Sequence, residues 1–168
     1  MNKQVMNEEI EKQLDKFLSN YFEIDNTIYK PDFLEEWFKK TNYPGIYYRL
    51  GLLYEYGLVK EKAYRQENYY FIEAAKMNYV PAMVHLGEIY LKYSNIEMHK
   101  AYEYLEKAAN QFHDSKAKYL LGLYYLQYGL YEPSNISLEY GIKFLKEADK
   151  LGCEKAKECL NLLKNLSI

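Results

Sequence analysis

Apolar residues recur at helical spacing along most of this chain. Leu86, Ile89 and Tyr90 fall three or four residues apart, as apolar residues on one face of an α-helix do. Two similar stripes occupy the N-terminal quarter, and their members are Ile10, Leu14, Phe17, Leu18, Tyr21 and Phe22, then Phe33, Leu34, Trp37 and Phe38. The pattern predicts an all-α fold.

The helical stretches form an internal repeat. Three segments, beginning at Ile46, Ala82 and Ala117, share a small or apolar residue, three residues, Leu-Gly, two residues and Tyr. Their Leu-Gly pairs are 36 and 35 residues apart. A truncated copy that begins at Ala156 has Leu160-Asn161 at this position, 39 residues after the third pair. A second helical element alternates with the first. Helix pairs repeated at this period predict a solenoid in which neighbouring pairs share a core.

The glycine of each Leu-Gly pair lies in the middle of a predicted helix. Glycine costs about 1 kcal/mol relative to alanine at such a position. Its recurrence indicates that the backbone of a neighbouring helix approaches closely, and we expect the alanine pairs 74/75 and 108/109 to form the other side of the contact. Ser94 and Glu97 have the spacing of a capping box, and Pro81 stands where a first helical turn tolerates proline.

This pattern resembles the Sel1-like repeat family, a branch of the tetratricopeptide-like helical repeats. The second copy fits the family motif best, through Ala82, Leu86, Gly87, Tyr90, Lys100, Ala101, Tyr104, Leu105, Ala108, Ala109 and Ala117. The first copy departs from the motif, with Ile46 in the alanine position and Gln66-Glu67 in place of Lys-Ala.

The resemblance implies a right-handed superhelical α/α solenoid of about four antiparallel helix pairs plus a C-terminal capping helix, near residues 154–165. Residues 1–44 would form an N-terminal helical cap or degenerate repeat. Residues 45–168 would hold three Sel1-like repeats and the capping helix, with the repeats at about 45–81, 82–116 and 117–155.

The charge balance argues against nucleic acid as a partner. The chain has 22 basic and 24 acidic residues, a net charge of −2. Nucleic-acid binders usually carry a basic excess, because their affinity comes largely from neutralising phosphates. Arg49 and Arg65 are the only arginines, so the chain has few guanidinium groups that could make bidentate contacts to phosphate or guanine.

The apolar runs also argue against a membrane location. The longest of them are far shorter than the ~20 residues that span a bilayer. The N-terminal MNKQVMNEEIEKQ lacks the apolar core of a signal peptide. We therefore expect a soluble, cytoplasmic protein, monomeric and with no membrane partner.

No catalytic motif is present: the chain has no Gly-rich phosphate loop, no Gly-x-Ser-x-Gly and no His-Glu-x-x-His. His85, His99 and His113 are 14 residues apart, which puts them on different helices or loops. Cys153 and Cys159 lack the spacing of a zinc site, and a separation of six residues puts them on different faces of a helix, so we expect reduced thiols. These observations predict no metal, no cofactor and no enzymatic activity.

What remains is a protein-binding surface. In the family that the chain resembles, the first helix of each pair lines the concave face. Counting by the helical period from each Leu-Gly pair, we expect the residues two before the leucine and two, five and six after it to face this groove. They are Tyr48, Leu52, Glu55 and Tyr56 in the first copy, Val84, Glu88, Leu91 and Lys92 in the second, and Tyr119, Leu123, Leu126 and Gln127 in the third.

The tyrosine content has two readings. The chain contains 21 tyrosines, and Tyr54, Tyr90 and Tyr125 occupy the motif position that we expect in the repeat core. Other tyrosines, Tyr48, Tyr56 and Tyr119 first, suit a binding surface because the ring is large and rigid and carries a polar tip. The excess is equally what an AT-rich coding sequence would give, since lysine, asparagine and isoleucine are frequent too.

The sequence thus predicts a non-catalytic protein–protein interaction module, an adaptor or scaffold that binds a protein in its concave groove. The alternative is a bacterial immunity protein that neutralises a cognate toxin. The mild acidity of the chain would suit a basic toxin. An enzyme or regulator of a small ligand ranks below both.

Overall fold

The computed structural model describes residues 3–23, 32–57, 66–93, 98–131 and 135–165. These residues form α-helices and no strand, which confirms the predicted all-α class. The helices are α1 (Lys3–Glu23), α2 (Asp32–Thr41), α3 (Pro44–Glu55), α4 (Gln66–Lys76), α5 (Val80–Tyr93), α6 (Met98–Gln111), α7 (Ser115–Tyr131), α8 (Asn135–Lys150) and α9 (Glu154–Asn165). The predicted capping box, Ser94 and Glu97, lies outside the described residues.

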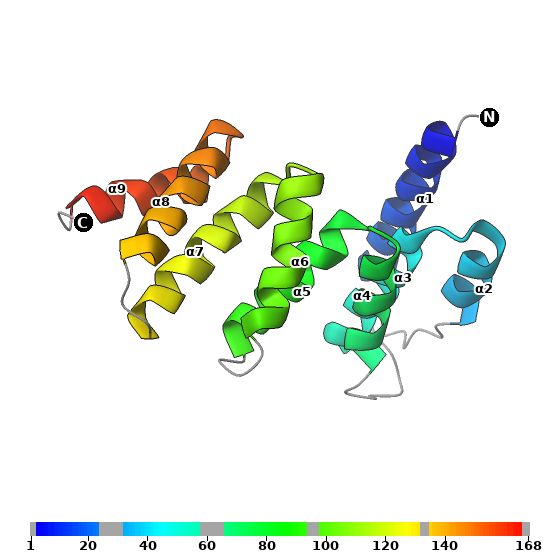
Figure 1. The fold of residues 1–168 in the computed structure, drawn as a ribbon. Coiled ribbons are helices and arrows are strands. Elements are labelled where there is room, and N and C mark those ends of the chain that lie inside the picture. The colour runs from blue at the N-terminus through cyan, green and yellow to red at the C-terminus, as the bar shows by residue number, and fades with distance from the viewer. Residues whose placement is uncertain (1–2, 24–31, 58–65, 94–97, 132–134, 166–168) are drawn as a thin grey trace. The chain divides into compact units, whose positions relative to one another are not determined.

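The chain forms two compact units, Met1–Ala82 and Met83–Ile168. The division lies inside α5, next to the predicted border between the first and second repeats. In the first unit α3 packs against α1, α2 and α4, and in the second α7 packs against α6 and α8, and α8 against α9 (Figure 1). The second helix therefore lies against the first in the first and third predicted repeats, and in the second repeat the Tyr90 ring of α5 stacks on Tyr104 of α6.

Each of the three motif glycines has a close neighbour on the second helix, but the neighbour is a large side chain and not the expected backbone at the alanine pairs. A Cβ atom on Gly51 would lie 2.5 Å from the ring of Phe71, and one on Gly122 would lie 2.7 Å from Leu145 Cγ. Gly87 faces Leu105 in the same way. Each glycine leaves a notch in the surface of the first helix, and a large, fully buried side chain of the second helix fills it. That side chain, and not the alanine pair, points at the first helix.

The motif tyrosine of each repeat is used in packing inside its helix pair. Each of the three stacks on an aromatic ring of the second helix, with interplanar angles of 20°, 3° and 8° and centroid distances of 5.4, 6.2 and 5.7 Å. The stacked pairs are Tyr54–Tyr70, Tyr90–Tyr104 and Tyr125–Phe144. The partner ring comes directly before the residue that fills the glycine notch, so each pair repeats the same two contacts.

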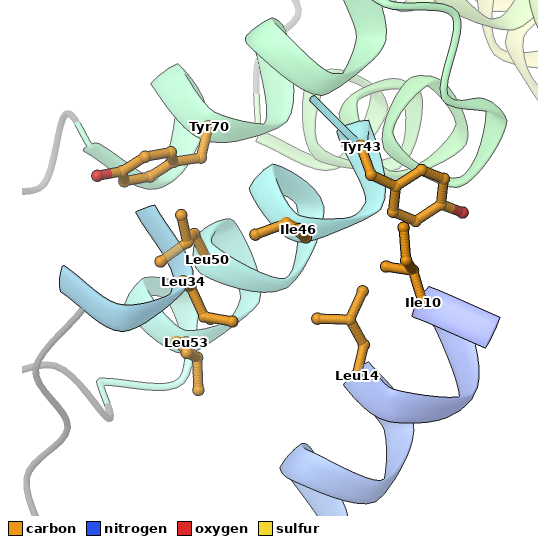
Figure 2. Packing of buried hydrophobic residues seen from close by; sticks show 8 residues of the cluster. All are labelled: Ile10, Leu14, Leu34, Tyr43, Ile46, Leu50, Leu53 and Tyr70. Carbon is orange, nitrogen blue, oxygen red and sulfur yellow. The ribbon is translucent and has the colours of Figure 1, made fainter. Parts of the chain in front are cut away.

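The N-terminal quarter contributes to the core of the first unit. Ile10 and Leu14 from α1, Leu34 from α2 and Tyr70 from α4 join buried residues of α3 in one cluster, which also contains Tyr43, Ile46, Leu50 and Leu53 (Figure 2). Trp37 and Phe38 pack against it. The side chains of Phe17, Leu18, Tyr21, Phe22 and Phe33, predicted to belong to the same stripes, lie outside the described residues.

Candidate functional site

The four predicted groove residues of α3 differ in exposure. Tyr48 is half-buried, with its ring 5.7 Å from that of Phe71 and 5.5 Å from that of Tyr79. Leu52 is also half-buried, whereas Glu55 is exposed and Tyr56 exposes 63% of its surface. Tyr48 is therefore largely a packing residue between α3 and the start of α5, whereas Tyr56, the residue directly after α3, is an exposed tyrosine.

On α5, the most buried of the four predicted residues is Val84, at 5% exposure, so its side chain is not available to a partner as the structure stands. Glu88 is half-buried and accepts a 2.8 Å hydrogen bond from Lys116 Nζ of α7. Leu91 is half-buried and Lys92 is exposed.

On α7, Leu126 is turned toward its own partner helix. Its side chain fills the space over Gly141 of α8, where a Cβ atom would lie 2.9 Å from Leu126 Cδ2. Tyr119 packs, half-buried, against a core cluster of Leu145, Ala148 and Ala156. Leu123 and Gln127 are half-buried.

Within the second unit, one predicted groove residue of α5 reaches the neighbouring first helix, α7. Glu88 of α5 reaches Lys116 at the start of α7. Burial raises the pKa of Tyr119, and the nearby Cys159, Cys153, Glu158 and Glu88 raise it further. Tyr119 therefore lies in the neighbourhood of both α9 and Glu88 of α5.

A polar cluster in the first unit was not anticipated from the sequence. The Glu11 carboxylate of α1 accepts hydrogen bonds from the phenols of Tyr43 and Tyr79, the latter at 2.7 Å, and pairs with Arg49 at 3.2 Å. Arg49 also contacts Asp15 at 2.9 Å and lies 5.4 Å from the centroid of the Tyr48 ring.

The Glu11 cluster connects equivalent places in two repeats. Tyr43 and Tyr79 each stand three residues before the first residue of their motif, and their carbonyls accept hydrogen bonds from the amides of Ile46 and Ala82 at the starts of α3 and α5. Burial raises the pKa of both phenols, and the hydrogen bond to Glu11 raises it further. Both phenols therefore remain protonated donors, and the cluster attaches α1 to the starts of α3 and α5.

A sequence signal for the role of α1 exists. Ile10 and Leu14 have the four-residue spacing of Ile46 and Leu50 and stand 36 residues before them, the same interval that separates Leu50 from Leu86. All four side chains are buried. The leucine register of the repeat therefore extends into α1, although Asp15 stands in the glycine position.

Other chemistry is sparse in the part of the chain that the structure describes. No three of its His, Cys, Asp or Glu residues are grouped so as to hold a metal ion. Cys153 and Cys159 are free thiols, and burial raises the pKa of the Cys159 thiol. Of the helices in these ranges, none combines the length and the apolar character needed to cross a bilayer.

Comparison of the chain with protein-family models, with curated proteins and with solved structures finds no match.

Proposed function

We propose that this protein is a non-catalytic protein-binding module built from Sel1-like repeats. In this proposal the helix pairs stack into a right-handed solenoid, and the first helices α3, α5 and α7 present the surface that binds one protein partner. The chain is then an adaptor or scaffold.

The observation that carries the proposal is the repeated use of the motif residues in packing. In all three pairs the glycine is filled by a large residue of the second helix and the motif tyrosine is stacked on an aromatic ring. These residues stabilise the fold, so other side chains of the first helices are available for a partner. Solenoids of helix pairs bind partners along the surface that such repeated helices form.

Fewer residues of the first helices are accessible than the twelve groove residues that the helical period selects. Glu55, Tyr56 and Lys92 are exposed, while Val84 and Leu126 are used in packing. An exposed tyrosine is a typical interface anchor, because little side-chain entropy is lost when it is buried.

The test is a binding experiment with a matched control. Proteins from the native host are captured on the wild-type chain, and the captured protein is purified and titrated by calorimetry. Tyr56→Ser is compared with Leu162→Ser on α9, because the two side chains expose 63% and 64% of their surface. We expect a 1:1 complex that Tyr56→Ser weakens by about tenfold or more, and that Leu162→Ser leaves unchanged.

Equal losses in the two variants, or an unchanged affinity in Tyr56→Ser, would contradict binding through the first helices. If the captured partner is a toxin and the complex abolishes its activity, the module acts as an immunity protein. If no protein binds and the chain turns over a small molecule, the proposal is wrong.

A further inference from the structure

A second surface of the first unit combines aromatic rings with carboxylates. Phe38 at the end of α2 stacks on Tyr47 of α3, with centroids 3.7 Å apart and an interplanar angle of 20°. Tyr47 in turn lies 5.7 Å from Tyr70 of α4, and Tyr70 lies 5.4 Å from Tyr69. Four rings from three helices therefore form one continuous aromatic group.

Two carboxylates border this aromatic group. Glu35 of α2 accepts a 2.7 Å hydrogen bond from the Tyr70 phenol. Glu73 lies one helical turn after Tyr69 on α4, and its side chain is 29% exposed. Burial raises the pKa of Tyr47, and the charges of Tyr69, Glu73 and Glu35 raise it further.

The surface is accessible at its rim. Tyr69 exposes 52% of its area, and Tyr47, Phe38 and Glu35 are half-buried, whereas Tyr70 is buried beneath them. Glu73 pairs with Lys76 at 2.6 Å, but the lysine side chain is 64% exposed. Such exposed pairs within one helix contribute little, so an incoming cation can displace Lys76.

Aromatic faces beside carboxylates favour one class of ligand. A cation over a tyrosine ring is attracted by the ring quadrupole, and a nearby carboxylate adds a charged hydrogen-bond acceptor. A guanidinium group satisfies both, because it is planar, stacks on rings and donates several hydrogen bonds in one plane.

We infer that the surface formed by Phe38, Tyr47, Tyr69, Glu35 and Glu73 binds an arginine side chain of a partner protein. It is made mainly by α2 and α4 and contains none of the predicted groove residues, of which Tyr56 is the one tested above. The inference therefore stands or falls separately from the proposed function.

The probe is a capped peptide of alternating glycine and arginine, titrated into the full 15N-labelled chain and followed by NMR. Matched peptides carry lysine or glutamine in place of arginine. We expect saturable shifts at the amides of Tyr69 and Glu73, weaker binding of the lysine peptide, and no binding of the glutamine peptide. The affinity should fall as salt is raised, because the carboxylates are partly exposed.

Two variants change the two members of the Glu73–Lys76 pair in turn. Glu73→Gln should weaken the arginine peptide about threefold to tenfold, and Lys76→Met should strengthen it about twofold, since it removes the competing cation. Glu106→Gln is the control, because this exposed carboxylate lies beside a tyrosine, Tyr102, whose phenol donates a 3.2 Å hydrogen bond to it, but belongs to the second unit. Circular dichroism confirms that each variant is folded.

Three results would overturn the inference. The first is no saturable shift with the arginine peptide, and the second is equal binding of the glutamine peptide. The third is an equal loss of affinity in Glu73→Gln and Glu106→Gln, since that would show attraction to negative charge anywhere on the protein.

Discussion

Substituting alanine for Gly51 measures how tightly α3 and α4 are packed. In an exposed helix interior this change is stabilising by about 1 kcal/mol, because alanine has the higher helix propensity. At Gly51 the added Cβ would lie 2.5, 2.7 and 2.9 Å from Cε1, Cδ1 and Cζ of Phe71. Normal carbon contacts are about 3.5 to 4.0 Å, so the overlap is about 1 Å.

The overlap cannot be relieved by a small movement of the ring. Phe71 is fully buried and its ring lies 5.7 Å from that of Tyr48. Overpacking in a core costs about 1 to 3 kcal/mol, and a rigid ring puts this site at the upper end. Subtracting the propensity gain, we expect Gly51→Ala to reduce the free energy of unfolding by about 2 kcal/mol, which lowers Tm by about 4 to 8 °C.

The assay is urea unfolding followed by the fluorescence of Trp37, the single tryptophan of the chain, which packs against the core of the first unit. Phe71→Ala provides the partner variant for a double-mutant cycle, because alanine lacks the ring carbons that the new Cβ meets, whereas a leucine would still meet it, as Leu105 does at Gly87. Gly51→Ala should be far less damaging in that background, with a coupling energy of about 1 to 2 kcal/mol. A stabilised or unchanged single variant, or a coupling near zero, would refute the packing argument.

Three further predictions concern charged and titratable groups. Glu11→Gln should reduce the stability of the first unit by about 1 to 3 kcal/mol in the same fluorescence assay, while Lys12→Gln, an exposed change on the same helix, should have no effect. Glu147 of α8 accepts a hydrogen bond from the ammonium group of Lys118 on α7, a lysine that is only 8% exposed, so Glu147→Gln should cost about 1 to 3 kcal/mol by thermal unfolding. Glu88→Gln breaks the exposed pair with Lys116 and should cost under about 1 kcal/mol; equal effects would contradict this ranking. Because the pKa of Tyr79 is raised in the folded protein, the stability that this phenol contributes is complete below the ordinary tyrosine pKa of about 10 and is lost as pH rises above that value. Phenolate absorbance should therefore grow together with the loss of helical circular dichroism. Full ionisation of all tyrosines with the helices intact would disprove this prediction.

The sequence determined the helices and their repeat. Buried residues such as Leu50, Leu86 and Leu121 recur at one register because each must face the core of its own helix pair, and this periodicity is visible without coordinates. The same pattern showed that the motif glycines need a close neighbour. The continuation of the register into Ile10 and Leu14 was also present in the sequence.

Tertiary structure alone decided which side chains meet. Phe71, not an alanine, fills the notch of Gly51, because the rotation of α4 about its axis is set by packing and not by local spacing. Period and family pattern placed Val84 in a groove, yet it is buried, since a helical face says nothing about how many neighbours cover it. Glu11 bonds to residues 32 and 68 positions away, and no local pattern encodes contacts over such separations, because they exist only once the helices have packed.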